Sequence, residues 1–152
     1  MKQFKIFVLL FFLFGCSRNE KVMVYLIPEG YEGPLVLIED PQAEDTLEIK
    51  EDTIVFDFRE SVILRLKGKF IEGSNLLSNL KYYYVDNVGN KTEIPIALGN
   101  YTQKDSNTVY LHLKHTQIRE NSKCDIVSTP ENFSVNIRKQ NHLCDSLFAI
   151  YP

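Results

Sequence analysis

The sequence predicts an α+β fold, in which a β-rich antiparallel sheet or sandwich is followed by one C-terminal helix. Short runs of alternating or β-branched side chains recur from residue 22 to residue 114, and such runs are typical of strands. Gly, Pro, Asn and Asp separate these runs at short intervals and mark turns. Beyond residue 128 the apolar side chains change to a helical spacing. The helix is therefore expected at the end of the chain.

The start of the chain has the layout of a secretory signal. Met1, Lys2 and Lys5 form a short basic start, and residues 6–14 are an unbroken apolar run. A membrane-spanning helix needs about 20 apolar residues, so this run is too short for a permanent anchor. We therefore expect residues 1–15 to be a signal peptide that is removed.

A lone cysteine ends the apolar run. Residues 13–16, Leu-Phe-Gly-Cys, resemble the lipobox of bacterial lipoproteins, in which a small residue precedes a cysteine that receives a diacylglyceryl group before cleavage. Phe14 is bulkier than the Ala, Ser or Thr that this pattern favours. The alternative, an ordinary signal peptide with an incidental cysteine, requires small residues at alternating positions before the cut, and Gly15 alone meets that need. We expect Cys16 to be the lipidated first residue of the mature chain.

The mature chain has the size of one domain and is mildly acidic. Removing the signal peptide takes away two lysines and no acid, so the net charge of −3 becomes −5. Its scattered Lys and Arg argue against nucleic acid, which requires a clustered basic face. We expect residues 16–21 to be a lipidated cysteine and short tether, and residues 22–152 to be a single domain. Five extended tether residues reach roughly 17 Å, so the domain is expected close to a membrane, facing the periplasm or the cell exterior.

Four strands are expected in the first half of the domain. Residues 22–27, VMVYLI, form a β-branched and aromatic run that ends at Pro28. A second run at 35–38 follows after a short connection, which predicts that the two strands pair as an antiparallel hairpin. From residue 46 the segment TLEIKEDTIVFDF alternates apolar and charged side chains around a Glu-Asp turn. That period of two predicts a half-buried strand pair.

Further strands follow in the middle of the chain. Alternating apolar side chains at residues 62–66 predict one strand. The segment KYYYVDNVGNKTEIPI predicts a hairpin with strands at 82–85 and 91–96, because the Asn and Gly residues between them tolerate a positive φ. Another strand is expected at 108–114.

The C-terminal part is predicted to be a short strand at 124–127 and then a helix. Ser128 can cap this helix, Glu131 lies three residues on as in a capping box, and Pro130 is tolerated in a first turn. Gln140 weakens the apolar stripe, so the helix is expected to be either continuous or broken there. The side chains expected to face the sheet are Phe133, Ile137, Cys144, Leu147, Phe148 and Tyr151.

The segment VYLIPEGYEGPLVLI, residues 24–38, resembles the opening of an uncharacterised family of small bacterial envelope lipoproteins. The family pattern is a strand, then Ile-Pro-x-Gly-(Tyr or Phe)-x-Gly, then a second strand, and the matching positions are Ile27, Pro28, Gly30, Tyr31 and Gly33. Further likeness lies in KYYYVDNVGNKTEIP and DIVSTPENF. The resemblance implies a domain of unknown function and brings no reaction, ligand or catalytic residue. Physically, the Pro-Gly segment is a structural turn, with a ligand-contacting loop as the alternative.

Two cysteines remain once Cys16 is lipidated. Cys124 lies on a predicted strand and Cys144 on the apolar face of the predicted helix. Disulfides persist outside the cytoplasm, so a bond between helix and sheet is expected, with two separately buried thiols as the alternative. A closed loop of about 20 residues would contribute roughly 3 kcal/mol in the chain-entropy model.

The histidines do not predict a metal site. His112 and His115 are three residues apart on an expected strand, so their side chains point to opposite faces. His142 is distant in sequence, and no CxxC or HExxH motif accompanies them. We expect surface or edge-strand histidines, with no metal and no other cofactor.

The aromatic residues supply the candidate binding surface. Neighbouring tyrosines alternate faces of a strand, so either Tyr82 and Tyr84 are exposed while Tyr83 enters the core, or the reverse. Tyr82 and Tyr84, with Tyr31, are the candidate binding surface, but cross-strand packing of these rings is favoured. The sequence contains no nucleophile elbow, phosphate-binding loop or spaced acid pair. It favours a non-enzymatic binding or assembly module for an envelope protein or a small ligand. The alternative is an enzyme with an unrecognised site, for which Tyr31, His112 and His115 are the candidate residues.

Overall fold

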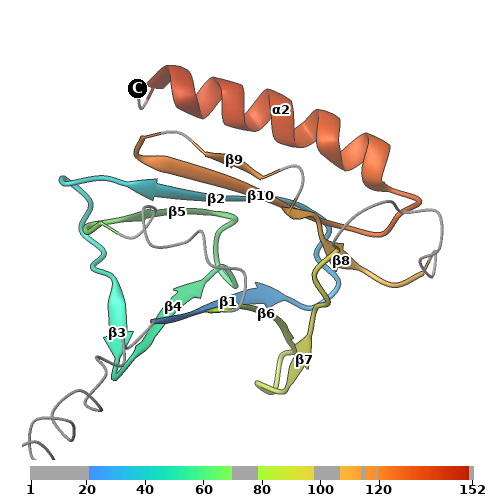
Figure 1. Cartoon of the computed structure of the whole chain (residues 1–152), viewed down its shortest axis with the longest axis horizontal. Helices are drawn as coiled ribbons and strands as arrows, with labels where there is room; N and C mark the ends of the chain where they lie inside the picture. Colours follow the sequence, from blue (N-terminus) through green and yellow to red (C-terminus); the bar gives the residue numbers. More distant parts are fainter. Residues whose placement is uncertain (1–20, 70–78, 98–106, 114–115, 119, 151–152) are drawn as a thin grey trace, which may run out of the picture.

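Two mixed β-sheets and one helix form three layers (Figure 1). The computed structural model describes residues 21–69, 79–97, 107–113, 116–118 and 120–150. The first sheet packs against one face of the second sheet, and helix α2 covers the other face of the second sheet. The predicted α+β fold with one C-terminal helix is confirmed.

The first sheet has the strand order β3-β4-β1-β6-β7. The central strand β1 pairs in parallel with both β4 and β6. Strands β3 and β7 close the edges as antiparallel hairpin partners of β4 and β6, so both predicted hairpins are confirmed. The bounds are β1 Val22–Pro28, β3 Glu48–Lys50, β4 Thr53–Asp57, β6 Leu80–Val85 and β7 Lys91–Glu93.

The second sheet has the order β5-β2-β10-β8, and β9 also pairs with β10. Strand β2 lies between β5, to which it is parallel, and β10, to which it is antiparallel. The bounds are β2 Gly33–Glu39, β5 Ile63–Leu66, β8 Tyr110–Leu111, β9 Gln117–Ile118 and β10 Ser122–Ser128, followed by the unbroken helix α2 at Phe133–Ile150. The strand predicted at 108–114 is therefore confirmed over two residues.

The predicted hairpin of the first two strands is wrong, because β1 and β2 lie in different sheets. The chain crosses between the sheets at residues 29–32. The loop length permits a hairpin, but burial decides against it. Six of the seven residues of β2 are buried, because this strand is covered by the first sheet on one face and by α2 on the other. A strand that buries both faces belongs in the middle layer.

Helix α2 begins later than the predicted capping box. Ser128 is the last residue of β10 and is fully buried, so it does not cap the helix. The backbone N–H groups of Val135 and Asn136 donate to the carbonyl of Asn132 instead. The Thr129 hydroxyl accepts from the Asn132 N–H at 3.3 Å. A polar turn therefore separates the strand from the helix.

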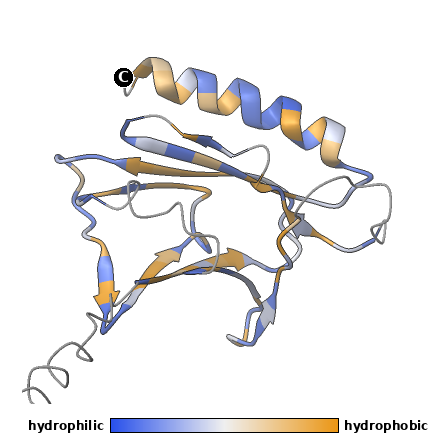
Figure 2. Cartoon of the chain, viewed as in Figure 1, coloured by the Kyte–Doolittle hydropathy of each residue, from blue (hydrophilic) through white to orange (hydrophobic). Residues whose placement is uncertain are grey.

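The sheet-facing side of α2 is also more polar than predicted. Its buried residues are Asn136, Gln140 and Cys144, whereas Phe133 and Ile137 are half-buried. Figure 2 shows hydrophilic residues along much of α2, in contrast to the mostly hydrophobic β2. The second sheet presents the Ser128 hydroxyl and the Cys124 carbonyl to the helix, and Asn136 and Gln140 donate to them. Polar side chains are therefore buried where apolar ones were expected. Tyr151 lies outside the described residues.

Candidate functional site

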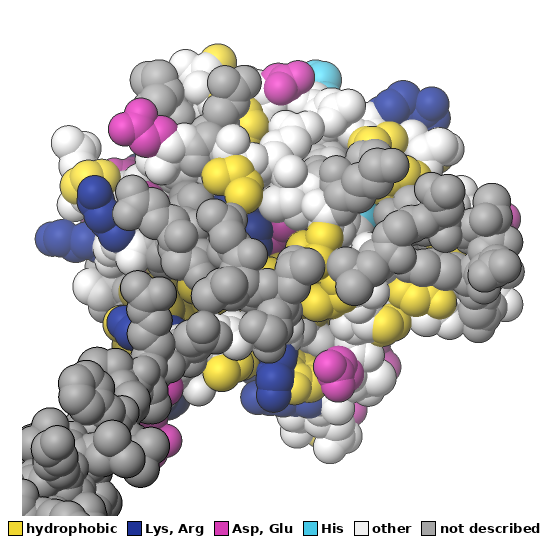
Figure 3. Space-filling view, in the orientation of Figure 1, with side chains coloured by type: hydrophobic (Ala, Val, Ile, Leu, Met, Phe, Trp, Pro, Cys, Tyr) yellow, Lys and Arg dark blue, Asp and Glu magenta, His cyan; other side chains and the backbone are white. Residues whose placement is uncertain are grey.

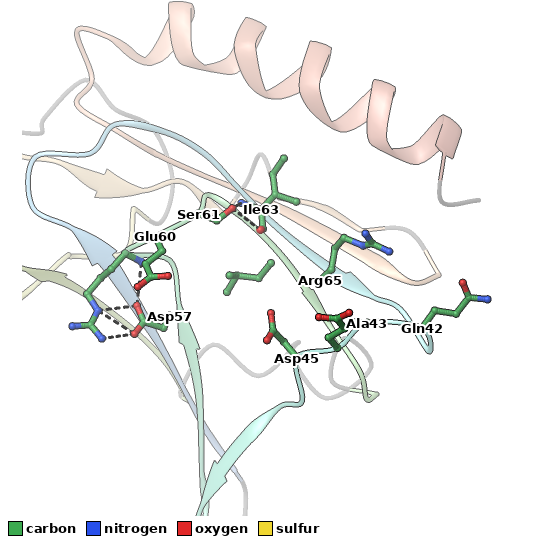
Figure 4. Close-up of a pocket in the computed structure, with 11 residues that line it drawn as sticks. Gln42, Ala43, Asp45, Asp57, Glu60, Ser61, Ile63 and Arg65 are labelled. Carbon is green, nitrogen blue, oxygen red and sulfur yellow. Dashed lines mark hydrogen bonds and ion pairs between the residues drawn. The ribbon is translucent and has the colours of Figure 1, made fainter.

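A recess of about 900 Å³ lies among the described residues. Three segments line it: the β2–β3 connection at residues 42–45, the β4–β5 connection with the end of β4, and strand β5 (Figure 4). Leu64 and Ile63 contribute its apolar lining, and the remaining wall is mainly polar or charged. This recess was not predicted, because its wall comes from connections that carry no motif.

Both arginines of the recess are held by carboxylates of the same chain. Arg59 Nε donates to Asp57 Oδ1 and Oδ2 at 2.9 and 3.0 Å, and these hydrogen bonds hold the pKa of Asp57 below its ordinary value although partial burial opposes them. Arg65 is paired with Asp40 in the same way, and its hydrogen bonds lower the pKa of Asp40. The guanidinium groups are therefore neutralised locally.

The remaining charge of the recess is negative. Glu44, Asp45 and Glu60 belong to its lining and form no ion pair among the residues that the structure describes. On the face shown in Figure 3, acidic and basic side chains lie scattered among one another rather than gathered by sign. The predicted absence of a basic, nucleic-acid-binding face remains a prediction.

The segment that connects β1 to β2 forms a tight structural turn. The Tyr31 N–H donates to the Pro28 carbonyl at 3.1 Å, and Gly30 has a φ of +74°. Gly33 has a φ of +153°, and a Cβ at this position would lie 2.7 Å from the Tyr31 hydroxyl oxygen. Glycine is therefore needed at residue 33 both for its backbone angle and for space.

The hydroxyls of Tyr31 and Tyr84 are both used inside the domain. Tyr31 Oη donates to the Pro34 carbonyl at 2.6 Å, and Tyr84 Oη donates to the Tyr31 carbonyl at 2.5 Å. Burial raises the pKa of Tyr31 to about 12 and also raises the pKa of Tyr84. Both rings are half-buried, so the aromatic surface that they offer to a partner is limited.

Glu32 joins the crossing segment to the turn before α2. Its Oε2 atom accepts hydrogen bonds from the Thr129 N–H at 2.9 Å, from the Thr129 hydroxyl at 3.1 Å and from the Ser128 hydroxyl at 3.2 Å. Asn132 Nδ2 donates to the same carboxylate at 3.3 Å. Partial burial raises the pKa of Glu32, but these hydrogen bonds outweigh it and the pKa lies below its ordinary value. We call these four residues the Glu32 junction.

Tyr82 does not belong to an exposed surface, and the packing alternative applies to it. Its side chain is 1% exposed, and its ring stacks on Tyr25 with a centroid distance of 4.2 Å. These two tyrosines are register partners on β6 and β1. Tyr82 points into the space between the sheets because β6 alternates faces, and its neighbour Tyr83 is half-buried.

A buried ion pair lies beside the two stacked tyrosines. Lys123 Nζ is 2.9 Å from Asp125 Oδ2, and both side chains are 2% exposed. Lys123 also donates to Tyr25 Oη at 3.0 Å. Burial lowers the pKa of Lys123, but the Asp125 carboxylate and the Tyr25 hydroxyl together more than offset this, so the pKa lies above its ordinary value.

Sequence reasoning missed this pair. The segment Ser-Lys-Cys-Asp-Ile-Val-Ser carries opposite charges two residues apart, which is also the pattern of a strand with a solvated face. Its position in β10, between two covered faces, is what makes it buried. The Thr116 hydroxyl donates to Asp125 Oδ1 at 2.7 Å and further satisfies the carboxylate. Because these groups are enclosed, they can hold the sheets in register but cannot reach a substrate.

The histidines differ from the prediction in one case. His112 is fully buried, its Nε2 donates to the Ser128 carbonyl at 2.8 Å, and its ring stacks on Phe133 at 4.5 Å. The surface position is wrong for His112, because the first turn of α2 covers it, whereas the edge-strand alternative agrees with its place directly after β8 at the end of the second sheet. His142 is exposed on α2, and His115 lies outside the described residues. Within the described ranges, no group of three metal-ligating side chains is brought together.

The predicted bond between Cys124 and Cys144 is present. It connects β10 to α2, with a Cα–Cα distance of 6.4 Å, and both residues are fully buried. Among the described helices, none is long and apolar enough to span a membrane.

Residues 19–141 match a family of unknown function, DUF6843. The chain belongs to this family. The prediction of an uncharacterised domain family is thereby confirmed, while the lipoprotein character of the chain stays a prediction. A solved structure described as "Putative Lipoprotein from Bacillus anthracis" is similar at 22% identity, over 70% of this chain and 68% of that chain, with a TM-score of 0.42. No curated protein matches this member of the family.

Proposed function

We propose that this chain is a lipid-anchored protein of the bacterial cell envelope whose domain binds a partner at the membrane surface without catalysing a reaction. The observation that carries the proposal is Cys16, which ends a short apolar run and follows Gly15. Five residues separate it from Val22, the first residue of β1. More than one acyl chain at such a cysteine gives stable anchoring.

The strand directions support a defined orientation of the anchored domain. Strands β4 and β6 run parallel to β1, and Val22 and Met23 pair with their first residues, Thr53 and Leu80. All three strands therefore begin at the end of the sheet that carries the tether. A strand of six residues is about 20 Å long, so the ends of β1 and β6 lie on the side away from the membrane. The Tyr31 segment and the β6–β7 turn are at this distal end.

The β6–β7 turn offers a well-ordered contact to a partner. Asp86 Oδ1 accepts from the N–H groups of Val88 at 2.9 Å and Asn90 at 2.8 Å, and Gly89 has a φ of +92°. Val88 is 83% exposed at the tip. A large apolar side chain on an ordered turn loses little conformational freedom on binding. Val88 is therefore the residue whose role in partner binding we would test.

The anchor is tested by labelling cells with a clickable fatty acid and separating membranes from soluble protein. The native chain is expected to carry the label and to stay with the membrane fraction, whereas Cys16→Ser should lose both properties. The same substitution at Cys144 is the matched control, because it removes a disulfide-bonded sulfur that lies inside the folded domain, and this variant should retain the label. Labelling of the Cys16→Ser chain would contradict the proposed anchor.

The binding role is tested by crosslinking intact membranes and recovering the tagged protein. Val88→Asp should reduce capture of a specific partner by about tenfold or more, which corresponds to about 1.4 kcal/mol. Ile150→Asp is the matched control, because Ile150 is 66% exposed and is the last residue of α2, whereas the start of that helix is the end that adjoins the distal segment. Equal capture by the two variants would exclude the turn, and no enrichment with the native chain would count against a protein partner.

A further inference from the structure

Helix α2 rests on the second sheet through a small apolar cluster. Thirteen buried residues form the core between the two sheets, whereas four form the cluster beneath α2: Val36, Ile38, Cys124 and Cys144. Partly buried side chains, including Leu147 and Phe148 of the helix, pack around these four. Hydrophobic attraction therefore holds the helix less firmly than it holds the sandwich.

Hydrogen bonds hold the first half of the helix. Asn136 Nδ2 donates to the Ser128 hydroxyl at 2.9 Å, and Gln140 Nε2 donates to the Cys124 carbonyl at 3.2 Å. The Glu32 junction fixes the turn before the helix. Neutral hydrogen bonds contribute little net free energy to docking, because water replaces them when the helix moves away.

The second half of the helix is held by the disulfide and the apolar cluster around it. Cys144 lies eleven residues after Phe133, the first residue of α2, and six before Ile150, its last. Ile150 is 66% exposed, and Leu147 and Phe148 are half-buried. Local opening of such an end requires far less free energy than global unfolding. Opening also gives a thiolate access to the otherwise buried disulfide.

We propose that the Cys124–Cys144 disulfide is a redox latch for α2. When it is oxidised, the helix covers the second sheet. A dithiol donor reduces it by transferring two electrons and two protons, so that one S–S bond becomes two thiols and the donor becomes a disulfide. The second half of α2 then leaves the sheet, while the Glu32 junction and the hydrogen bonds of Asn136 and Gln140 keep the first half in place. Val36, Ile38 and Ile63 become accessible as an apolar surface in the reduced form.

The sandwich is expected to stay folded when the latch opens. Lys123 and Asp125 point from β10 toward the first sheet, on the face opposite to Cys124. The pairing of β10 with β2 also involves no residue of α2. The Lys123–Asp125 ion pair and the hydrogen bonds between β10 and β2 are therefore expected to remain when the helix moves.

The test is hydrogen exchange of the full chain, oxidised and after treatment with excess dithiothreitol, with alkylation and mass measurement to establish that both thiols formed. Reduction should speed amide exchange at residues 141–150 by at least about tenfold and leave β1, β4 and β6 unchanged. A double variant, Cys124→Ala with Cys144→Ala, should show the fast exchange with or without the dithiol. The native chain alone decides the question if the double variant does not fold.

Two results would overturn the latch. In the first, α2 keeps its protection after both thiols have formed, which would mean that the helix docks without the bond. In the second, the strands of both sheets lose protection together with α2, which would make the disulfide a determinant of global stability rather than a latch.

Discussion

The two faces of strand β10 are covered by different means. Toward the first sheet, Lys123 and Asp125 form a buried ion pair inside a large apolar core. Toward α2, Cys124 forms a covalent bond within a small apolar cluster. The comparison teaches that a large interface can enclose charges if each has partners, whereas a small interface benefits most from a bond that does not depend on buried area.

The largest effect is expected from breaking the ion pair on the first face. Asp125→Ala leaves the Lys123 ammonium buried without its carboxylate, which should lower the free energy of unfolding by about 3–5 kcal/mol. Urea denaturation followed by circular dichroism measures this loss. The double variant Lys123→Met with Asp125→Leu is the control, because it removes both charges and should lose much less stability. Equal losses of unfolding free energy in the two variants would show that the unpaired ammonium is not the cause of the destabilisation.

A second comparison uses one phenylalanine from each interface. Phe56 is 1% exposed between the sheets, so Phe56→Ala should destabilise the whole domain by about 3–5 kcal/mol. Phe148 belongs to α2 and is partly buried against the cluster beneath the helix, so Phe148→Ala should lower the free energy of unfolding by about 1–2 kcal/mol because less area is lost. Hydrogen exchange should confine the second effect to α2. Loss of protection across both sheets in Phe148→Ala would remove the distinction between the interfaces.

The smallest effect is expected from acid, acting on the Glu32 junction. The pKa of Glu32 is lowered in the folded protein from an ordinary value of 4.5. Its stabilising contribution is therefore present above pH 4.5 and is lost as the pH falls through the folded pKa. The protection of amides at the start of α2, measured against their intrinsic exchange rate at each pH, should fall over this range in the native chain. In Glu32→Gln the amides at the start of α2 should already be less protected at neutral pH, and their protection should change less with acid. If this variant and the native chain respond equally to acid, another group causes the sensitivity.

The elements that were predicted correctly depend on neighbours in the sequence. The β3–β4 and β6–β7 hairpins each contain their own turn, so alternation and turn residues suffice to predict them. The disulfide was also expected, because the remaining cysteines form a pair and lie on elements predicted to pack together. In the candidate site, the Tyr31 segment was predicted to be a turn, and its internal hydrogen bonds explain why.

The elements that were predicted wrongly depend on distant parts of the chain. His112 was expected at the surface, but Phe133 and Ser128 enclose it. The ion pair of β10 resembles a solvated strand face in sequence. The recess is assembled from two connections and an edge strand that share no motif. In each case the local pattern is the same whether the residue meets water or another layer.

By itself, the sequence determined which segments are strands and helix, where most turns fall and which cysteines are available for a bond. It also carries the signal from which a lipid anchor at Cys16 is predicted. The tertiary structure alone decided that β1 and β2 separate into two sheets, that Lys123 and Asp125 are buried, and that polar residues of α2 face inward. The physical reason is that periodicity reports how a segment divides into faces. What each face meets depends on the area that all layers bury together.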